Sequence, residues 1–111
     1  MASVVNIRNV SFGEETVVYI GRKNARTGWK GSVLANPFVI GKDGSRDEVV
    51  EKYRKWLNAK CRENDAEIMA ELRRIQKLDR KALRLVCWCA PEACHGDVIL
   101  RALNWLDSLD F

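Results

Sequence analysis

Hydrophobic positions follow a strand period at the start of the chain and a helix period further on. Two short β-branched and aromatic runs, residues 4–8 and 17–20, are separated by turn residues at 11–15. This pattern predicts two strands, which can form a hairpin. From residue 21 to 44 no period is sustained and Gly and Pro recur, so we expect a long ordered loop of the kind that often carries function.

Three helices are predicted downstream. Ser45 and Glu48 have capping-box spacing, which predicts a helix start at this point. The first helix presents an apolar face of Val49, Val50, Tyr53, Trp56 and Leu57. The second carries Ile68, Leu72 and Ile75 on one face and should end near residues 77–79. The third should begin between His95 and Asp97, with Val98, Ile99, Ala102, Leu103 and Leu106 on its apolar face.

Residues 83–89 form an almost continuous apolar run that is rich in β-formers. Such a run is typical of a strand that is covered on both faces, and we place it at the centre of the sheet. The elements predict a single α/β domain over residues 1–111. We expect a Rossmann-like, mixed and partly parallel sheet with about three helices in two or three layers; the strand order stays open.

Composition and charge indicate the class of protein and its expected location. The chain has 111 residues, of which 47% are hydrophobic and 31% charged, as in an ordinary globular protein. No apolar run approaches the length of a membrane span and the first residues lack a signal-peptide pattern, so we expect a cytoplasmic protein with no membrane partner. The net charge of +4 comes from Arg22, Lys23, Arg26 and Lys30, because the remaining basic residues equal the acidic ones in number.

The segment from Cys87 to Asp97 is the strongest candidate for a functional site. Cys89 lies at the carboxyl end of the predicted central strand, and Cys94 and His95 lie at a helix start. The helix dipole there attracts anions and lowers the pKa of a nearby thiol. We predict Cys89 or Cys94 as a thiolate nucleophile, His95 as its general base or ion-pair partner, and Asp97 as the orienting carboxylate.

Simpler interpretations of the same segment stay open. Cys87 is interpreted as a core residue, and Asp97 also fits a first-turn acid that the helix dipole stabilises. The strand, Cys, loop and helix resemble the phosphate loop of cysteine phosphatases and rhodaneses in architecture alone, because those enzymes have Arg where His95 stands and Pro91 lacks an amide donor. Zinc held by some of Cys87, Cys89, Cys94 and His95 is disfavoured by their spacing, so we predict no metal and no cofactor.

The cationic loop, residues 21–31, is the second candidate site. Its cations and its aromatic ring can hold a phosphate and stack on a base, and the predicted ligand contacts are Arg22, Arg26, Trp29 and Lys30. A merely solvated surface loop is the alternative. Asn36, in the turn before Pro37, is either a further ligand contact or a structural turn residue.

Several motifs together resemble the domain-of-unknown-function family numbered 4326. They are residues 4–8, 19–22, 34–38, 44–49, 53–57, 87–91 and 94–97. The family occurs in bacteria, archaea and their viruses, and the resemblance implies no established activity. A second uncharacterised family, numbered 488, has a similar Cys, loop and Cys-His arrangement, which favours treating Cys89, Cys94 and His95 as one unit.

These observations lead to one expected function and two rivals. We expect an enzyme, or a domain derived from one, that binds a phosphorylated small molecule or nucleic acid between the cationic loop and the Cys-His segment. The first rival is a non-catalytic nucleotide- or nucleic-acid-binding module, which would still bind after Cys89→Ser and Cys94→Ser. The second is a zinc-stabilised interaction protein, which would unfold with chelator. The oligomeric state stays open.

Overall fold

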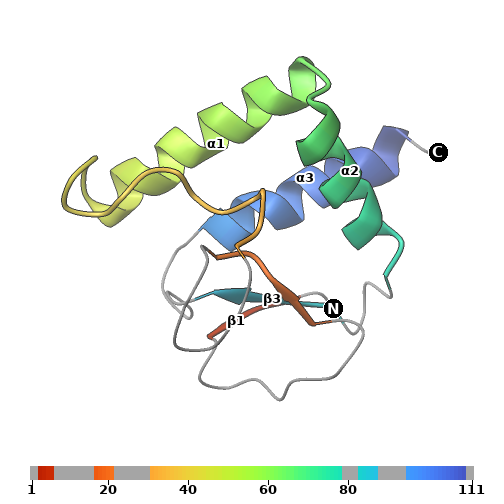
Figure 1. Cartoon of the computed structure of the whole chain (residues 1–111), viewed down its shortest axis with the longest axis horizontal. Helices are drawn as coiled ribbons and strands as arrows, with labels where there is room; N and C mark the ends of the chain where they lie inside the picture. Colours follow the sequence, from red (N-terminus) through yellow and green to blue (C-terminus); the bar gives the residue numbers. More distant parts are fainter. Residues whose placement is uncertain (1–2, 7–16, 22–30, 79–82, 88–94, 110–111) are drawn as a thin grey trace.

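The computed structural model of the protein describes residues 3–6, 17–21, 31–78, 83–87 and 95–109. The strands in these residues are β1 (Ser3–Asn6), β2 (Val17–Tyr19) and β3 (Arg84–Cys87). The helices are α1 (Arg46–Arg62), α2 (Ala66–Gln76) and α3 (His95–Leu109). The molecule is a small α/β protein, as predicted (Figure 1).

The sheet has the order β1-β3-β2, and both outer strands run parallel to β3. The central position predicted for residues 83–89 is confirmed. The hairpin between the first two strands is wrong, because β1 and β2 lie on opposite sides of β3 instead of next to each other. The strand from the longest of the three strand-like runs, residues 83–89, takes the place where both its edges are paired. The parallel part of the predicted sheet is confirmed, and the three described strands contain no antiparallel pair.

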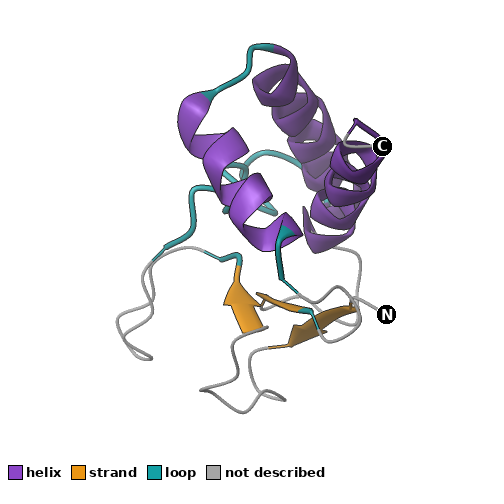
Figure 2. Ribbon diagram, turned by 90° about the vertical axis from the view of Figure 1, so that its right-hand side faces the viewer, coloured by secondary structure: helices purple, strands orange, loops and turns teal. Residues whose placement is uncertain are grey.

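The register separates the two faces of the sheet. Val4, Leu85 and Val18 are aligned across the strands and face the helices, while Val5, Val86 and Tyr19 are aligned on the opposite face. Leu85 and Val86 are both completely buried, which confirms that β3 is covered on both faces. All three helices lie on one side of the sheet, so the described elements form two layers (Figures 1 and 2).

Local chemistry defines the helix starts. Ser45 Oγ accepts from the backbone N–H of Glu48, and the Glu48 side chain accepts from the backbone N–H of Ser45, so the predicted capping box is present. Asp65 caps α2 by accepting from Ile68 N at 3.0 Å. None of the helices in the described ranges is long and apolar enough to cross a membrane.

Helix α3 is the centre of the helical layer. It packs against α1, α2 and β3, and its residues Ile99, Leu103 and Leu106 are fully buried. Trp56, predicted on the apolar face of the first helix, is half-buried and packs on the edge of this core, as does Phe38. Their large rings extend from the apolar surface towards solvent, as is common for aromatic side chains.

Candidate functional site

The carboxyl edge of the sheet meets the first turn of α3. Ile20 directly follows β2, and its N–H donates to Val86 O at 3.0 Å, which extends the pairing with β3 by one residue. Gly96, in the first turn of α3, is buried against this edge. A Cβ on Gly96 would lie 2.8 Å from Val4 Cγ1 and 3.1 Å from Ile20 Cδ1. The absence of a side chain at residue 96 therefore lets the start of α3 approach β1 and the end of β2 closely.

The imidazole of His95 is fixed at this junction. The ring is buried, and its Nε2 lies 2.7 Å from the carbonyl oxygen of Ile20. A carbonyl can only accept, so Nε2 carries the hydrogen and donates. In the neutral ring the other nitrogen, Nδ1, then holds the lone pair and is the basic atom.

Tyr53 supports the same ring from helix α1. The two ring centroids are 5.0 Å apart and the planes are inclined by 72°, which is an edge-to-face contact. The Tyr53 hydroxyl donates to Leu34 O at 2.6 Å, and Tyr53 and Leu34 are fully buried. Tyr53 therefore satisfies its own polar group while it holds both the imidazole and the 31–35 segment.

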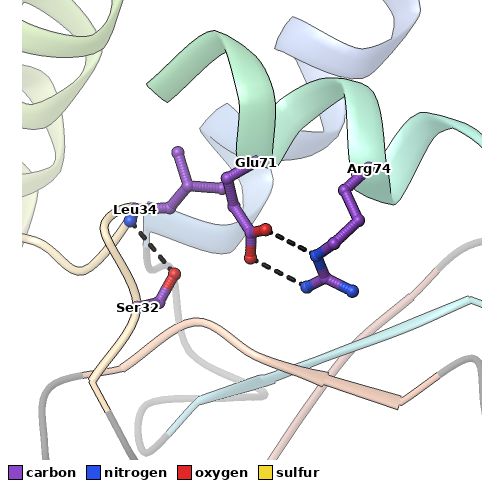
Figure 3. Close-up of polar contacts among 4 residues, drawn as sticks. All are labelled: Ser32, Leu34, Glu71 and Arg74. Atoms are coloured by element: carbon purple, nitrogen blue, oxygen red, sulfur yellow. Dashed lines mark hydrogen bonds and ion pairs between the residues drawn. The ribbon is translucent and has the colours of Figure 1, made fainter. Parts of the chain in front are cut away.

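Hydrogen bonds in the 31–35 segment complete a closed circuit around His95. Ser32 N donates to Gly21 O at 2.9 Å, and Leu34 N donates to Ser32 Oγ at 3.0 Å. Figure 3 shows the second of these bonds together with the Glu71–Arg74 ion pair of helix α2. We call the residues of this circuit the His95 cluster: Ile20, Gly21, Ser32, Leu34, Tyr53 and His95. Gly21 and Ser32 lie on either side of residues 22–30 in the sequence, so the two flanks of the cationic loop are joined beside His95.

Asp97 and Asn36 are the other predicted site residues that the structure describes. Asp97 is exposed in the first turn of α3. Two residues along a helix correspond to a rotation of about 200°, which separates the Asp97 side chain from that of His95. The group that fixes Nε2 is the Ile20 carbonyl, so a catalytic role for Asp97 stays a prediction. Asn36 Oδ1 accepts from Phe38 N at 2.9 Å, which is the predicted structural turn.

The remaining predicted contacts lie outside the described residues. These are Cys89 and Cys94 in the Cys-His segment and Arg22, Arg26, Trp29 and Lys30 in the cationic loop. Cys87 ends β3, level with Asn6. Cys61 is a half-buried free thiol in α1, and burial raises its pKa. No group of three potential metal-ligating side chains occurs among the described residues, and the zinc hypothesis rests mainly on cysteines outside them.

The position of His95 at a helix start is confirmed, whereas the two groups that contact its ring were not predicted. The Ile20 carbonyl is a backbone atom and has no signature in the sequence. Tyr53 was correctly assigned to the apolar face of its helix, and its contact with His95 was not foreseen. One signal was present: a tyrosine on a buried helix face needs an acceptor for its hydroxyl, so it indicates a polar neighbour inside the core.

Comparisons with known proteins place the chain among uncharacterised viral relatives. It is 32% identical over 73 residues to the "Uncharacterized 12.4 kDa protein in nrdA-td intergenic region" of Enterobacteria phage T4, an alignment that covers 65% of this chain and 62% of the phage protein. It is 31% identical over 104 residues to "Uncharacterized protein R718" of Acanthamoeba polyphaga mimivirus, covering 85% of this chain and 72% of that protein. The chain thus spans less than two-thirds of the length of the phage relative.

No solved structure matches the chain. The family model described as "Domain of unknown function (DUF4326)" matches residues 5–105, which include every described strand from Val5 onward and the site at the start of α3. The chain therefore belongs to the DUF4326 family.

Proposed function

We propose that the protein is a thiol-dependent enzyme, or a domain derived from one, that binds a phosphorylated ligand such as a nucleotide at the carboxyl edge of the sheet. The observation that carries this proposal is the bond between His95 Nε2 and Ile20 O, 2.7 Å long, at the start of α3. Because Nε2 is fixed as the donor, Nδ1 is the basic atom of the neutral ring, which is the atom that a general base uses.

The proposed chemistry begins with a proton transfer within the Cys-His segment. The thiol of Cys94 or Cys89 gives its proton to His95 Nδ1, which produces a thiolate and an imidazolium that retains its Nε2–H bond to Ile20. The positive end of the α3 dipole supports this step, because it stabilises a thiolate at the helix start. The thiolate is then the nucleophile.

The ligand is proposed from the neighbours of the His95 cluster. Open parallel sheets bind ligands outside the carboxyl ends of their strands, where Ile20 lies. The bond between Ser32 N and Gly21 O joins two described residues on either side of 22–30 in the sequence, and we propose that Arg22, Arg26 and Lys30 contact the ligand at this edge. Their charges favour a phosphorylated ligand, and Trp29 adds a surface for a base. The names of the viral relatives supply no activity, so the proposal rests on these residues.

The test is alkylation of the native protein over a range of pH, with each cysteine followed by mass spectrometry and metal content measured on the same sample. We expect Cys89 or Cys94 to react with an apparent pKa well below the free-thiol value of about 8.5. Inorganic phosphate or AMP should protect that residue. Cys61 is the internal reference, because burial raises its pKa and its alkylation should require higher pH.

A His95→Gln variant separates the base from the anchor. The glutamine amide can still donate to Ile20 O, but it has no basic nitrogen. We expect the pKa of the reactive thiol to rise towards its ordinary value in this variant while the protein stays folded. Asp97→Asn, in the same assay, tests the orienting role predicted for that carboxylate. Slow reaction of both Cys89 and Cys94 with ordinary or raised pKa would contradict the proposal.

A non-catalytic binding module is the second candidate, and the edge-to-face contact between Tyr53 and His95 favours it. A ring held on one nitrogen and packed against a tyrosine can serve purely as a link between α3, α1 and the end of β2. This candidate predicts that Cys89→Ser and Cys94→Ser retain the affinity for AMP, measured by calorimetry. Loss of binding in both variants would count against a module that does not use its thiols.

A further inference from the structure

A groove lies between helices α1 and α3, and none of its described lining residues belongs to the His95 cluster. It has a volume of about 620 Å³. Its α1 side consists of residues at helical spacing from Arg54 to Arg62, and its α3 side of residues at the same spacing from Val98 to Trp105. Leu57 and Val98 supply apolar surface inside it. One wall of the groove is thus a face of α1, and the other wall is a face of α3.

The charged groups in this groove all have one sign. Arg54, Arg62 and Arg101 line it, and none of the other described residues in its lining is acidic. Arg54 is bound to Glu51, whereas neither Arg62 nor Arg101 forms an ion pair within the described part of the chain. A neighbouring cleft of about 480 Å³ adds Lys55 together with one acid, Glu63. The surface between the helices is therefore cationic.

An exposed indole completes the groove. Trp105 is 43% exposed although it is one of the largest apolar side chains in the molecule. It lies one turn after Arg101 on the same face of α3, so a flat ring and a guanidinium stand next to each other on one wall. Guanidinium groups bind phosphate oxygens in pairs of hydrogen bonds, and aromatic rings stack on nucleobases whatever their sequence.

We propose that this groove binds single-stranded nucleic acid, with phosphates at Arg62 and Arg101 and a base stacked on Trp105. A cationic channel with an aromatic platform is the usual arrangement in proteins that bind single strands without sequence preference. The cations of the groove are confined to a strip between two helices, which disfavours a duplex, because the two backbones of a duplex need a broader basic face. An acidic peptide would match the charges but leave the exposed indole unused.

The proposal is tested by fluorescence anisotropy with a labelled 12-nucleotide oligo-dT and the full chain. Trp105→Ala should weaken binding roughly 5- to 150-fold, as expected for loss of one stacked base, while Trp105→Phe should retain most of the affinity. The double variant Arg62→Gln/Arg101→Gln should weaken binding and reduce the slope of log K against log salt by about 1.4, because each phosphate contact contributes about 0.7 for a single strand.

Matched controls give the outcomes that would overturn the proposal. Lys42→Gln/Lys77→Gln removes two exposed cations from outside the groove and should leave the affinity within about twofold, allowing for long-range electrostatics. Equal losses in both double variants would mean that net charge alone attracts the strand. Competition by polyglutamate or by duplex DNA as effective as that by unlabelled oligo-dT would assign the groove to another partner. Loss of binding in Arg22→Gln/Arg26→Gln with none in Trp105→Ala would move the strand to the cationic loop.

The proposal for the groove and the proposal for the thiol site can be contradicted independently of each other. Variants of Trp105 should leave the pH dependence of Cys89 and Cys94 alkylation unchanged. Conversely, Cys89→Ser and Cys94→Ser should leave the oligo-dT affinity unchanged.

Discussion

Burial determines how much a single hydrogen bond contributes to the stability of the fold around His95. Tyr53 and Ser108 each donate a hydroxyl hydrogen bond of 2.6 Å to a carbonyl oxygen, but the bond from Tyr53 to Leu34 is buried and the bond from Ser108 to Trp105 is exposed. Water replaces a lost partner in the exposed case only. Removal of the buried bond should therefore lower the free energy of unfolding more than removal of the exposed bond.

We predict that Tyr53→Phe lowers the free energy of unfolding by about 1–3 kcal/mol, because it leaves the Leu34 carbonyl buried without its hydroxyl donor. Ser108→Ala, the control of equal bond length, should change it by less than about 0.5 kcal/mol. Urea unfolding monitored by far-UV circular dichroism measures both. Equal effects in the two variants would mean that burial does not control the strength of the Tyr53 bond.

At the same scale, the sequence predicted that His95 lies at a helix start but not which groups contact its ring. His95 follows from its position between a strand and a helix start, where a polar residue meets the dipole. The Ile20 carbonyl could not be predicted, because any residue supplies a carbonyl and its position depends on the strand order. Residues at 20 and 95 meet only once β2 and α3 have packed, and no local pattern encodes that contact.

Elements were predictable where local chemistry defines them. The capping box at Ser45 and the spacing of Ile68, Leu72 and Ile75 identified α1 and α2 correctly, since these signals act within a few residues. The pairing of β1 and β2 was wrong, because two neighbouring strand patterns fit a hairpin as well as they fit separate places on either side of a third strand. That choice depends on the burial of β3, which is a tertiary property.

The packing of α3 on the sheet gives a prediction for Gly96. Alanine favours a helix over glycine by about 1 kcal/mol, yet its Cβ at residue 96 would lie 2.8 Å from Val4. The clash should dominate, so Gly96→Ala should destabilise the protein by about 1–3 kcal/mol in thermal or urea unfolding.

A double-mutant cycle identifies the cause of that loss. Val4→Ala removes the two nearest methyl groups, so in the Gly96→Ala background it should cost less than it does alone, with a coupling of about 0.5 kcal/mol or more. Strictly additive effects would show that contact with β1 is not what requires glycine at the start of α3.

For the whole molecule, the central position of α3 predicts how the chain unfolds. One helix contacts α1, α2 and β3, and through His95 and Gly96 it also meets the end of β2 and strand β1. The elements that flank the site therefore share their stability with the core. We propose that residues 1–111 form one cooperative domain, in which the sheet and the helical layer are lost together.

Two leucines of α3 test this cooperativity. Leu103 is completely buried and Leu109 is 55% exposed, so Leu103→Ala should cost about 2–5 kcal/mol and Leu109→Ala less than about 0.5 kcal/mol. Unfolding is followed in urea by tryptophan fluorescence and by far-UV circular dichroism. In a single domain both probes shift by the same amount in Leu103→Ala, because the cavity weakens every element packed on α3. Separate transitions would show that the sheet and the helices unfold as independent units, and the site between them would then lose its rigid support before the core does.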